Sequence, residues 1–331
     1  MYLKSIEVQN LKCFTGLGLD FGSEVEPDGI RRWTALLGEN GVGKSTLLQA
    51  IGTALAGPEA VGQLLPFPDK WVRAGESHSE IRAELFWSKG DEHPSPGKGD
   101  SFSAWFVIAS ESATLPEASS DIMQADPQGR SFTVHPDDKA QKDFALLRRT
   151  AYSEKARGWL ACGYGPFRRL SGGGEVSRSI IASGRRSARL VTLFQESAAL
   201  TDVETWLKEL YNTARDGDTG NQKRLHLVKQ AFRERLLPFS AELQVDARQA
   251  RLKVAGRQPM GFSHLSDGYR SMLALSIDLI RWLTVAFPEA DEPMKCPGVV
   301  LIDELDAHLH PKWQREIGFW LLEKFPKLQF I

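Results

Sequence analysis

The segment GENGVGKST at residues 38–46 constrains this chain most, because it satisfies the pattern GxxxxGK[ST]. The apolar run before it, at 33–37, predicts a buried central strand, and apolar residues at helical spacing predict a helix from 44 to 56. In a strand, loop and helix of this kind, backbone N–H groups and the helix dipole face phosphate oxygens. Lys44 would reach the outer phosphates, and Ser45 would offer its hydroxyl to Mg²⁺. The pattern predicts a phosphate site made of Asn40, Gly41, Gly43, Lys44, Ser45 and Thr46.

A pair of carboxylates follows a second apolar run. The sequence VVLI at 299–302 predicts a buried strand that ends in Asp303 and Glu304. Such a strand carries its last side chains to the sheet edge where phosphates bind, so Asp303 is predicted to hold Mg²⁺ and Glu304 to deprotonate an attacking water. Taken alone, this dipeptide is more often a capping pair on the next helix. The phosphate loop earlier in the chain favours the catalytic interpretation, with Lys44 and Glu304 as catalytic residues.

A third segment, LSDGYR at 265–270, lies between the loop and the carboxylates. Alone, Ser266 would be read as the cap of an ordinary helix. In this order, however, the three motifs resemble those of the ABC-type ATPases, whose signature begins LSGG; Asp267 replaces the first of its glycines. The resemblance implies that Ser266 and Gly268 contact the γ-phosphate of an ATP bound by the opposite subunit. It therefore implies a homodimer, or a higher homo-oligomer, built around ATP and Mg²⁺.

Within that family, IEVQNLKCF at 6–14 resembles the SMC, RecF and RecN branch, which handles DNA. The segments 163–168, 265–270 and 303–311 resemble stand-alone bacterial ATPases, some described as ATP-binding proteins involved in virulence and others as ATPase subunits of Septu and retron anti-phage systems. This resemblance implies antiviral defence with a nuclease effector of HNH type, and direct DNA contact as an option. Two alternatives stay open: the nucleotide-binding subunit of a membrane transporter, and an ATP-bound scaffold with little hydrolysis.

The expected fold class is α/β: a P-loop NTPase of the ABC-ATPase head type, with a mixed sheet, an antiparallel β layer and a largely helical insertion. We expect the head at residues 1–88 and 240–331, and the insertion at 89–239, with a strand near 159–164 and a helical hairpin near 200–237 that breaks at 216–218. No heptad repeat is sustained there, which argues against a long coiled-coil arm. The chain stops inside the strand that would precede the family's switch histidine, so that residue is expected beyond Ile331.

Composition limits the remaining possibilities. Lys and Arg total 41 against 42 for Asp and Glu, so any contact with a polyanion must be a local patch. The arginines 178, 185, 186 and 189 form a basic cluster that predicts either a DNA contact or a solvated face, and the solvated face is the commoner case. Three separated cysteines and the lack of an export signal or long apolar segment predict a cytoplasmic protein without membrane contact. His308, His310 and Asp306 are interpreted as loop and interface residues.

Overall fold

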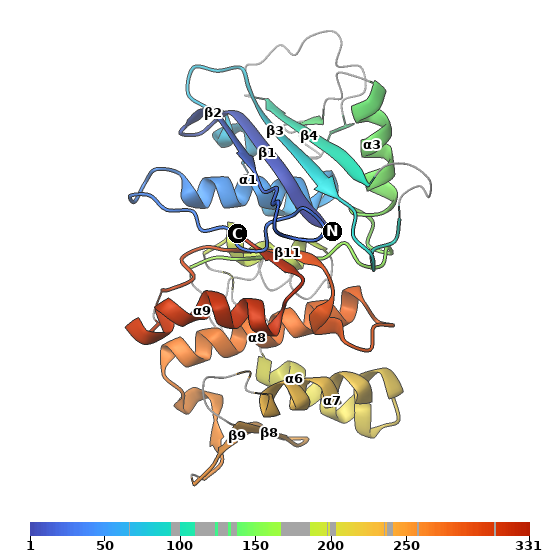
Figure 1. The fold of residues 1–331 in the computed structure, drawn as a ribbon, viewed down its shortest axis with the longest axis vertical. Coiled ribbons are helices and arrows are strands. Elements are labelled where there is room, and N and C mark those ends of the chain that lie inside the picture. Colours follow the sequence, from blue (N-terminus) through green and yellow to red (C-terminus); the bar gives the residue numbers. More distant parts are fainter. Residues whose placement is uncertain are drawn as a thin grey trace.

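A computed structural model gives the fold and describes residues 1–65, 67–93, 100–109, 123–124, 132–133, 138–166, 186–196, 198, 203–234, 236, 241–256, 258–307 and 309–331. Its elements form an antiparallel β layer, a central parallel sheet with helices on both sides, and a smaller helical and β-hairpin part at the opposite end (Figure 1).

The antiparallel layer is a six-stranded sheet in the order β2-β1-β3-β4-β6-β5. Alternate residues of β3 are buried, among them Ile81, Ala83 and Leu85, which is the pattern of a strand with one covered face. The antiparallel β layer expected from the sequence is confirmed. The strands are β1 (Tyr2–Leu11), β2 (Phe14–Asp20), β3 (His78–Phe86), β4 (Ser101–Ala109), β5 (Met123–Gln124) and β6 (Phe132–Thr133).

The central sheet holds β7 (Ala161–Tyr164), β11 (Gly298–Ile302) and β12 (Leu328–Phe330), all parallel and in the order β12-β11-β7. Every residue of β11 is buried, and its side chains alternate between two cores. Val299 and Leu301 join the core shared with the β layer, whereas Val300 and Ile302 join the core of the C-terminal helices. Helix α1 (Lys44–Ala56) lies on one side of this sheet, and α8 (Asp267–Ala286) and α9 (Pro311–Lys324) lie on the other (Figure 1). Both faces are therefore covered, as a parallel sheet requires.

The prediction of a buried central strand at 33–37 is wrong. Trp33 makes an isolated parallel bridge to Phe330, and the Thr34 N–H donates to the Phe330 carbonyl at 2.9 Å, but no strand forms. Leu37 is 92% exposed. A central strand is buried when a neighbouring strand pairs with it on each side. Here β12 pairs only with the first residues of the run, through Phe330. An apolar pattern shows which side chains a segment could bury. Whether the segment forms a strand depends on the strands elsewhere in the chain that can pair with it.

The predicted helical hairpin is confirmed, and it lies at the end of the molecule opposite the β layer (Figure 1). Helices α6 (Val203–Arg215) and α7 (Thr219–Arg233) pack together and are joined at 216–218. The Asp218 side chain caps α7 by accepting the Asn221 N–H at 2.9 Å. A second three-stranded sheet follows, in the order β10-β9-β8. Its strands are β8 (Ala241–Val245), β9 (Ala250–Val254) and β10 (Met260–Gly261), and the other elements are α2 (Pro58–Leu64), η1 (Pro68–Trp71), α3 (Asp138–Arg149), η2 (Arg186–Arg189), α5 (Val191–Phe194), η3 (Phe262–His264) and η4 (Pro293–Lys295).

The range 89–239, expected to form an insertion, contributes strands to both sheets of the head. β4 pairs with β3 along its whole length, and β7 pairs with β11. The loop-rich stretch after residue 88 connects the paired strands β3 and β4, and a long connection of this kind resembles the start of an insertion in sequence.

Candidate nucleotide site

The phosphate loop has the backbone of an anion cradle. Gly41 (φ 83°) and Gly43 (φ 103°) both lie in the left-handed region, which favours glycine. Gly43 precedes the first turn of α1, where no side chain caps the helix and no acidic residue is present. The first N–H groups of α1 therefore lack a side-chain partner, which is the arrangement that favours a bound anion.

Lys44 folds back onto this loop. Its ammonium donates to the carbonyls of Gly38 and Glu39, each at 2.7 Å. The lysine side chain thereby links the start of α1 to the start of the loop. Both bonds are to backbone oxygens, and phosphate oxygens are stronger acceptors because they are charged. A bound triphosphate would compete for the same ammonium.

The strand β11 delivers the predicted carboxylates to the same region. Asp303 is buried, and its N–H donates to the Tyr164 carbonyl at 2.8 Å, so its position is fixed by the central sheet. Glu304 is exposed and has φ 47°, a left-handed backbone that non-glycine residues seldom adopt. The chain therefore turns sharply between the two residues, and two adjacent carboxylates acquire different surroundings.

Loop and carboxylates open into one cavity of about 1060 Å³. Asn40 and Lys44 line it from the loop, and Asp303 and Glu304 line it from the end of β11. The structure thus brings together residues more than 250 positions apart in the sequence, as predicted. The remaining loop residues predicted for the site, namely Gly41, Gly43, Ser45 and Thr46, lie on the same loop or in the first turn of α1.

The oxygen donors of this region fit Mg²⁺. Mg²⁺ is usually held by one or two protein oxygens, with the remaining positions taken by phosphates and water. The Ser45 hydroxyl and the Asp303 carboxylate are donors of that kind, and the described residues contain no group of three His, Cys, Asp or Glu side chains that could hold a metal. A bound Mg²⁺ would neutralise phosphate charge during transfer.

The signature segment lies elsewhere on the same chain. Ser266 is the first residue before α8, is exposed, and makes no side-chain capping bond. The next turn is held instead by Asp267, which pairs with Arg270. Neither Ser266 nor Gly268 lines the cavity that holds Lys44 and Asp303. One copy of the chain therefore keeps its signature hydroxyl apart from its own phosphate loop.

Two residues that support the loop were missed by the sequence analysis. A Cβ atom added to Gly43 would lie 2.5 Å from the Cys13 sulfur and 2.7 Å from Cζ of Phe14. The Cys13 thiol also contacts the Val42 carbonyl at 3.7 Å. The turn between β1 and β2 thus packs directly against the loop. The sequence holds no local signal for this contact, because it joins segments about 30 residues apart.

The predicted basic cluster is corrected by burial. Arg186 and Arg189 are only 5% and 8% exposed, so neither a DNA contact nor a solvated face describes them. Arg186 donates to the carbonyls of Ser153 and Trp159, each at 2.9 Å, and Arg189 lies over the Trp282 ring. Arg186 therefore joins η2 to the segment before β7, and Arg189 packs against α8, which are packing roles that charge alone does not predict. Arg178, Arg185, Phe167, Arg168 and His308 lie outside the described residues.

Comparisons with known proteins identify the family of this chain. Residues 33–331 match the family described as "AAA domain, putative AbiEii toxin, Type IV TA system". The Septu protein PtuA of Bacillus mycoides (strain KBAB4) is 28% identical over 334 residues, covering 100% of this chain and 37% of that protein. The Retron Ec83 probable ATPase of Escherichia coli is 36% identical over 140 residues, covering 40% of this chain and 24% of that protein. The chain spans well under half the length of these relatives.

Among solved structures, the Smc head domain of Pyrococcus furiosus, crystallised with an extended coiled coil and bound to the C-terminal domain of ScpA, covers 100% of this chain and 88% of its own, with a TM-score of 0.54 and 16% identity. That likeness concerns the fold. Among the described helices, none combines the length and apolar character needed to cross a bilayer. The family match includes the phosphate loop, LSDGYR and both carboxylates. The chain therefore belongs to this AAA-domain ATPase family and has the fold of an SMC-type head.

Proposed function

We propose that this chain binds and hydrolyses ATP between two copies of itself, and that the cycle controls a nuclease effector in cytoplasmic anti-phage defence. The observation that carries the proposal is the shared cavity of Lys44, Asp303 and Glu304, together with an exposed Ser266 that lies outside it. A site built this way lacks a contact that a second copy could supply. The names of the relatives, a Septu protein and a retron ATPase, support the defence role.

In the proposed reaction, water attacks the γ-phosphate in line with the departing ADP. Lys44 and the N–H groups at the start of α1 stabilise the negative charge that develops on the phosphoryl oxygens. Glu304 accepts the proton of the attacking water, and its exposed position gives water access. Ser45 and Asp303 are the residues that would hold Mg²⁺.

The test of this assignment is Glu304→Gln. The amide keeps the shape of the side chain but cannot accept the proton, so ATP turnover should fall by about a hundredfold or more while ATP still binds. Rapid filtration with labelled ATP measures both quantities. Turnover at the wild-type rate would show that Glu304 is not the base. Matched changes at exposed Glu316, on α9 outside the cavity, should leave both unchanged.

Two other functions from the sequence analysis are separable. A scaffold that holds ATP without using it would show no faster single-turnover hydrolysis with DNA and effector than without them. A transporter subunit would require a membrane partner, and purification of the complex from a native source would identify either a nuclease or a membrane-spanning protein. The identity of the nuclease as an HNH enzyme, and direct contact with DNA, belong to this proposal and to the same purification.

A further inference from the structure

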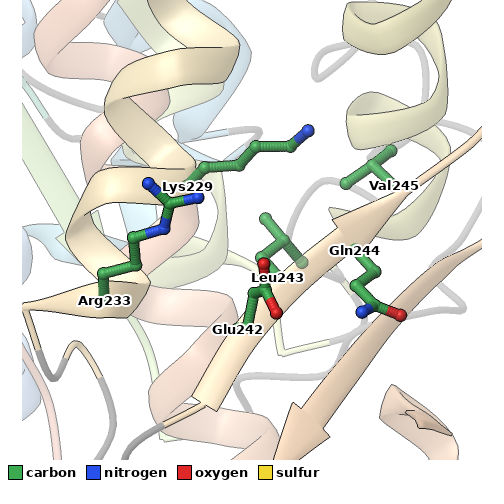
Figure 2. A pocket seen from close by; sticks show the side chains of 6 residues that line it. All are labelled: Lys229, Arg233, Glu242, Leu243, Gln244 and Val245. Carbon is green, nitrogen blue, oxygen red and sulfur yellow. The ribbon is translucent and has the colours of Figure 1, made fainter.

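A second pocket, separate from the nucleotide site, lies between helix α7 and strand β8, at the end of the molecule opposite the antiparallel β layer (Figures 1 and 2). Its volume is about 240 Å³. Lys229 and Arg233 line it from the helix, one turn apart, and the residues from Glu242 to Val245 line it from the strand (Figure 2). The space exceeds the roughly 30 Å³ that one water occupies, but is below the size typical of pockets for whole nucleotides.

The two cations are uncommitted. Within the part of the chain that the structure describes, neither the Lys229 ammonium nor the Arg233 guanidinium takes part in an ion pair or hydrogen bond. The nearby Glu234 is occupied elsewhere, because its carbonyl accepts Lys324 at 2.8 Å and its carboxylate accepts Gln230 at 2.8 Å. Two adjacent positive charges favour an anion between them, and the one carboxylate that lines the pocket, Glu242, forms no ion pair with either of them among the described residues.

The positive charge continues onto the hairpin. In the β8–β9 ladder, Lys253 lies opposite Glu242, and Arg251 lies opposite Gln244. Residues directly opposite each other share one face of the sheet, so both cations neighbour residues that line the pocket. The other face is buried in the core through Leu243 and Leu252.

Charge counts over α7 and the hairpin agree with this placement. Helix α7 and the β8–β9 hairpin (residues 241–254) together carry seven cationic side chains against two anionic ones, although the whole chain has a net charge of −1. The cations are Lys223, Arg224, Lys229, Arg233, Arg248, Arg251 and Lys253, and the anions are Glu242 and Asp246. The surface is thus the kind of local patch that a balanced chain needs to bind a polyanion.

We propose that the pocket between α7 and β8 binds phosphate groups of a nucleic-acid backbone, with Lys229 and Arg233 holding one phosphate and Arg251 and Lys253 extending the contact along the strand. This site requires neither ATP nor a second copy of the chain. It differs from the basic cluster that the sequence suggested, since that cluster is partly buried. Phosphate contacts of this type position a nucleic acid without reading its sequence.

The test measures binding of a fluorescent DNA duplex by polarisation, over a range of salt concentrations, with the full chain in the Lys44→Ala background to silence the phosphate loop. Lys229→Ala with Arg233→Ala should weaken binding about tenfold at low salt and reduce the slope of log K against log salt by about two. Glu242→Gln should tighten binding, because a carboxylate that repels phosphate is removed. The control is Lys142→Ala with Lys155→Ala, which removes two exposed charges elsewhere.

A second arm separates two sources of phosphate. Titration calorimetry with inorganic phosphate, on the same proteins, detects a site for free anions. If the wild-type pocket binds phosphate but not duplex, and the double change abolishes that binding, the ligand is a free phosphate species and the assignment to a nucleic-acid backbone is overturned. The proposal is overturned if the double variant binds both probes like its parent, if the parent binds neither, or if the control pair loses as much affinity. Circular dichroism confirms that each variant is folded.

Discussion

At the scale of single residues, the two left-handed glycines of the phosphate loop differ in one respect that can be tested. Gly41 has open space where a Cβ would lie, whereas Gly43 faces Cys13 and Phe14. Gly41→Ala should cost roughly 1 kcal/mol of backbone strain and retain some ATP binding. Gly43→Ala adds a collision to the same strain and should abolish ATP binding. Thermal unfolding with and without a non-cleavable ATP analogue measures both effects; equal effects would contradict the contact with Cys13 and Phe14.

Another residue-scale prediction concerns alkaline pH. Burial raises the pKa of the Cys162 thiol to about 12, with nearby Asp278 acting in the same direction and Arg189 opposing it. An unfolded chain releases this proton near pH 9, so the folded chain binds more protons between about pH 9 and 12. The stability contributed by the neutral thiol is complete below pH 9 and is lost as pH rises towards 12.

Cys162→Ala should therefore make the alkaline loss of stability shallower, even if it lowers stability at neutral pH by removing buried volume. Urea unfolding midpoints at several pH values give the two slopes. Cys13→Ala is the matched control, because Cys13 is exposed. Parallel slopes for the Cys162 variant and the wild type would mean that the thiol ionises similarly in both states.

At the scale of elements, one side chain joins the end of the chain to its beginning. The Gln329 amide on β12 donates to the Leu3 carbonyl and accepts the Leu3 N–H, both at 2.8 Å, and Gln329 is fully buried. It thus continues the hydrogen bonding of a sheet between two strands of different sheets. Gln329→Leu should cost about 3 kcal/mol, because it leaves two buried backbone groups unpaired. Gln314→Leu, on exposed α9 surface, should cost far less; comparable losses in urea unfolding would contradict this role.

Periodicity predicted the elements whose burial is decided locally. Strands β1 to β4 and β11 and helices α6, α7 and α8 all carry their pattern within one segment. Helix α9 was not predicted, although Trp313, Ile317 and Leu321 recur at helical spacing after Pro311, so the signal was present. The run at 33–37 could not be judged this way, since its burial depends on distant strands.

For the site, motif spacing identified Lys44, Asp303 and Glu304 as neighbours, because strand, loop and helix chemistry fixes where such residues meet. Motif spacing did not predict the left-handed backbone of Glu304 or the contact of Cys13 with the loop, since both arise from packing. Packing also explains why the burial of Arg186 and Arg189 was not predicted. Arginine is usually exposed to solvent, but here carbonyl acceptors and an aromatic ring make burial possible.

At the scale of the whole molecule, the central sheet divides two cores, and the cavity of the carboxylates opens at the end of that sheet. The described hairpin of α6 and α7 is short, with 13 and 15 residues, where the Smc head used for comparison carries an extended coiled coil. In the proposed dimer, the two copies would meet at surfaces near the nucleotide, including the exposed start of α8.

That arrangement predicts complementation between two inactive variants. Lys44→Ala damages the phosphate loop and keeps Ser266, whereas Ser266→Arg keeps the loop and blocks the signature. A mixed dimer of the two contains one intact shared site, so co-expressed chains should regain about a quarter of wild-type ATPase activity, since half of the dimers are mixed and each has one working site of two. Lys44→Ala with Glu304→Gln is the control, because both residues serve the same half of the site and no intact site can form. Differential tags show whether mixed dimers form. If they form and neither pair regains ATPase activity, each chain completes its site alone or not at all. If only the first pair regains activity, Ser266 acts on the site of the other subunit.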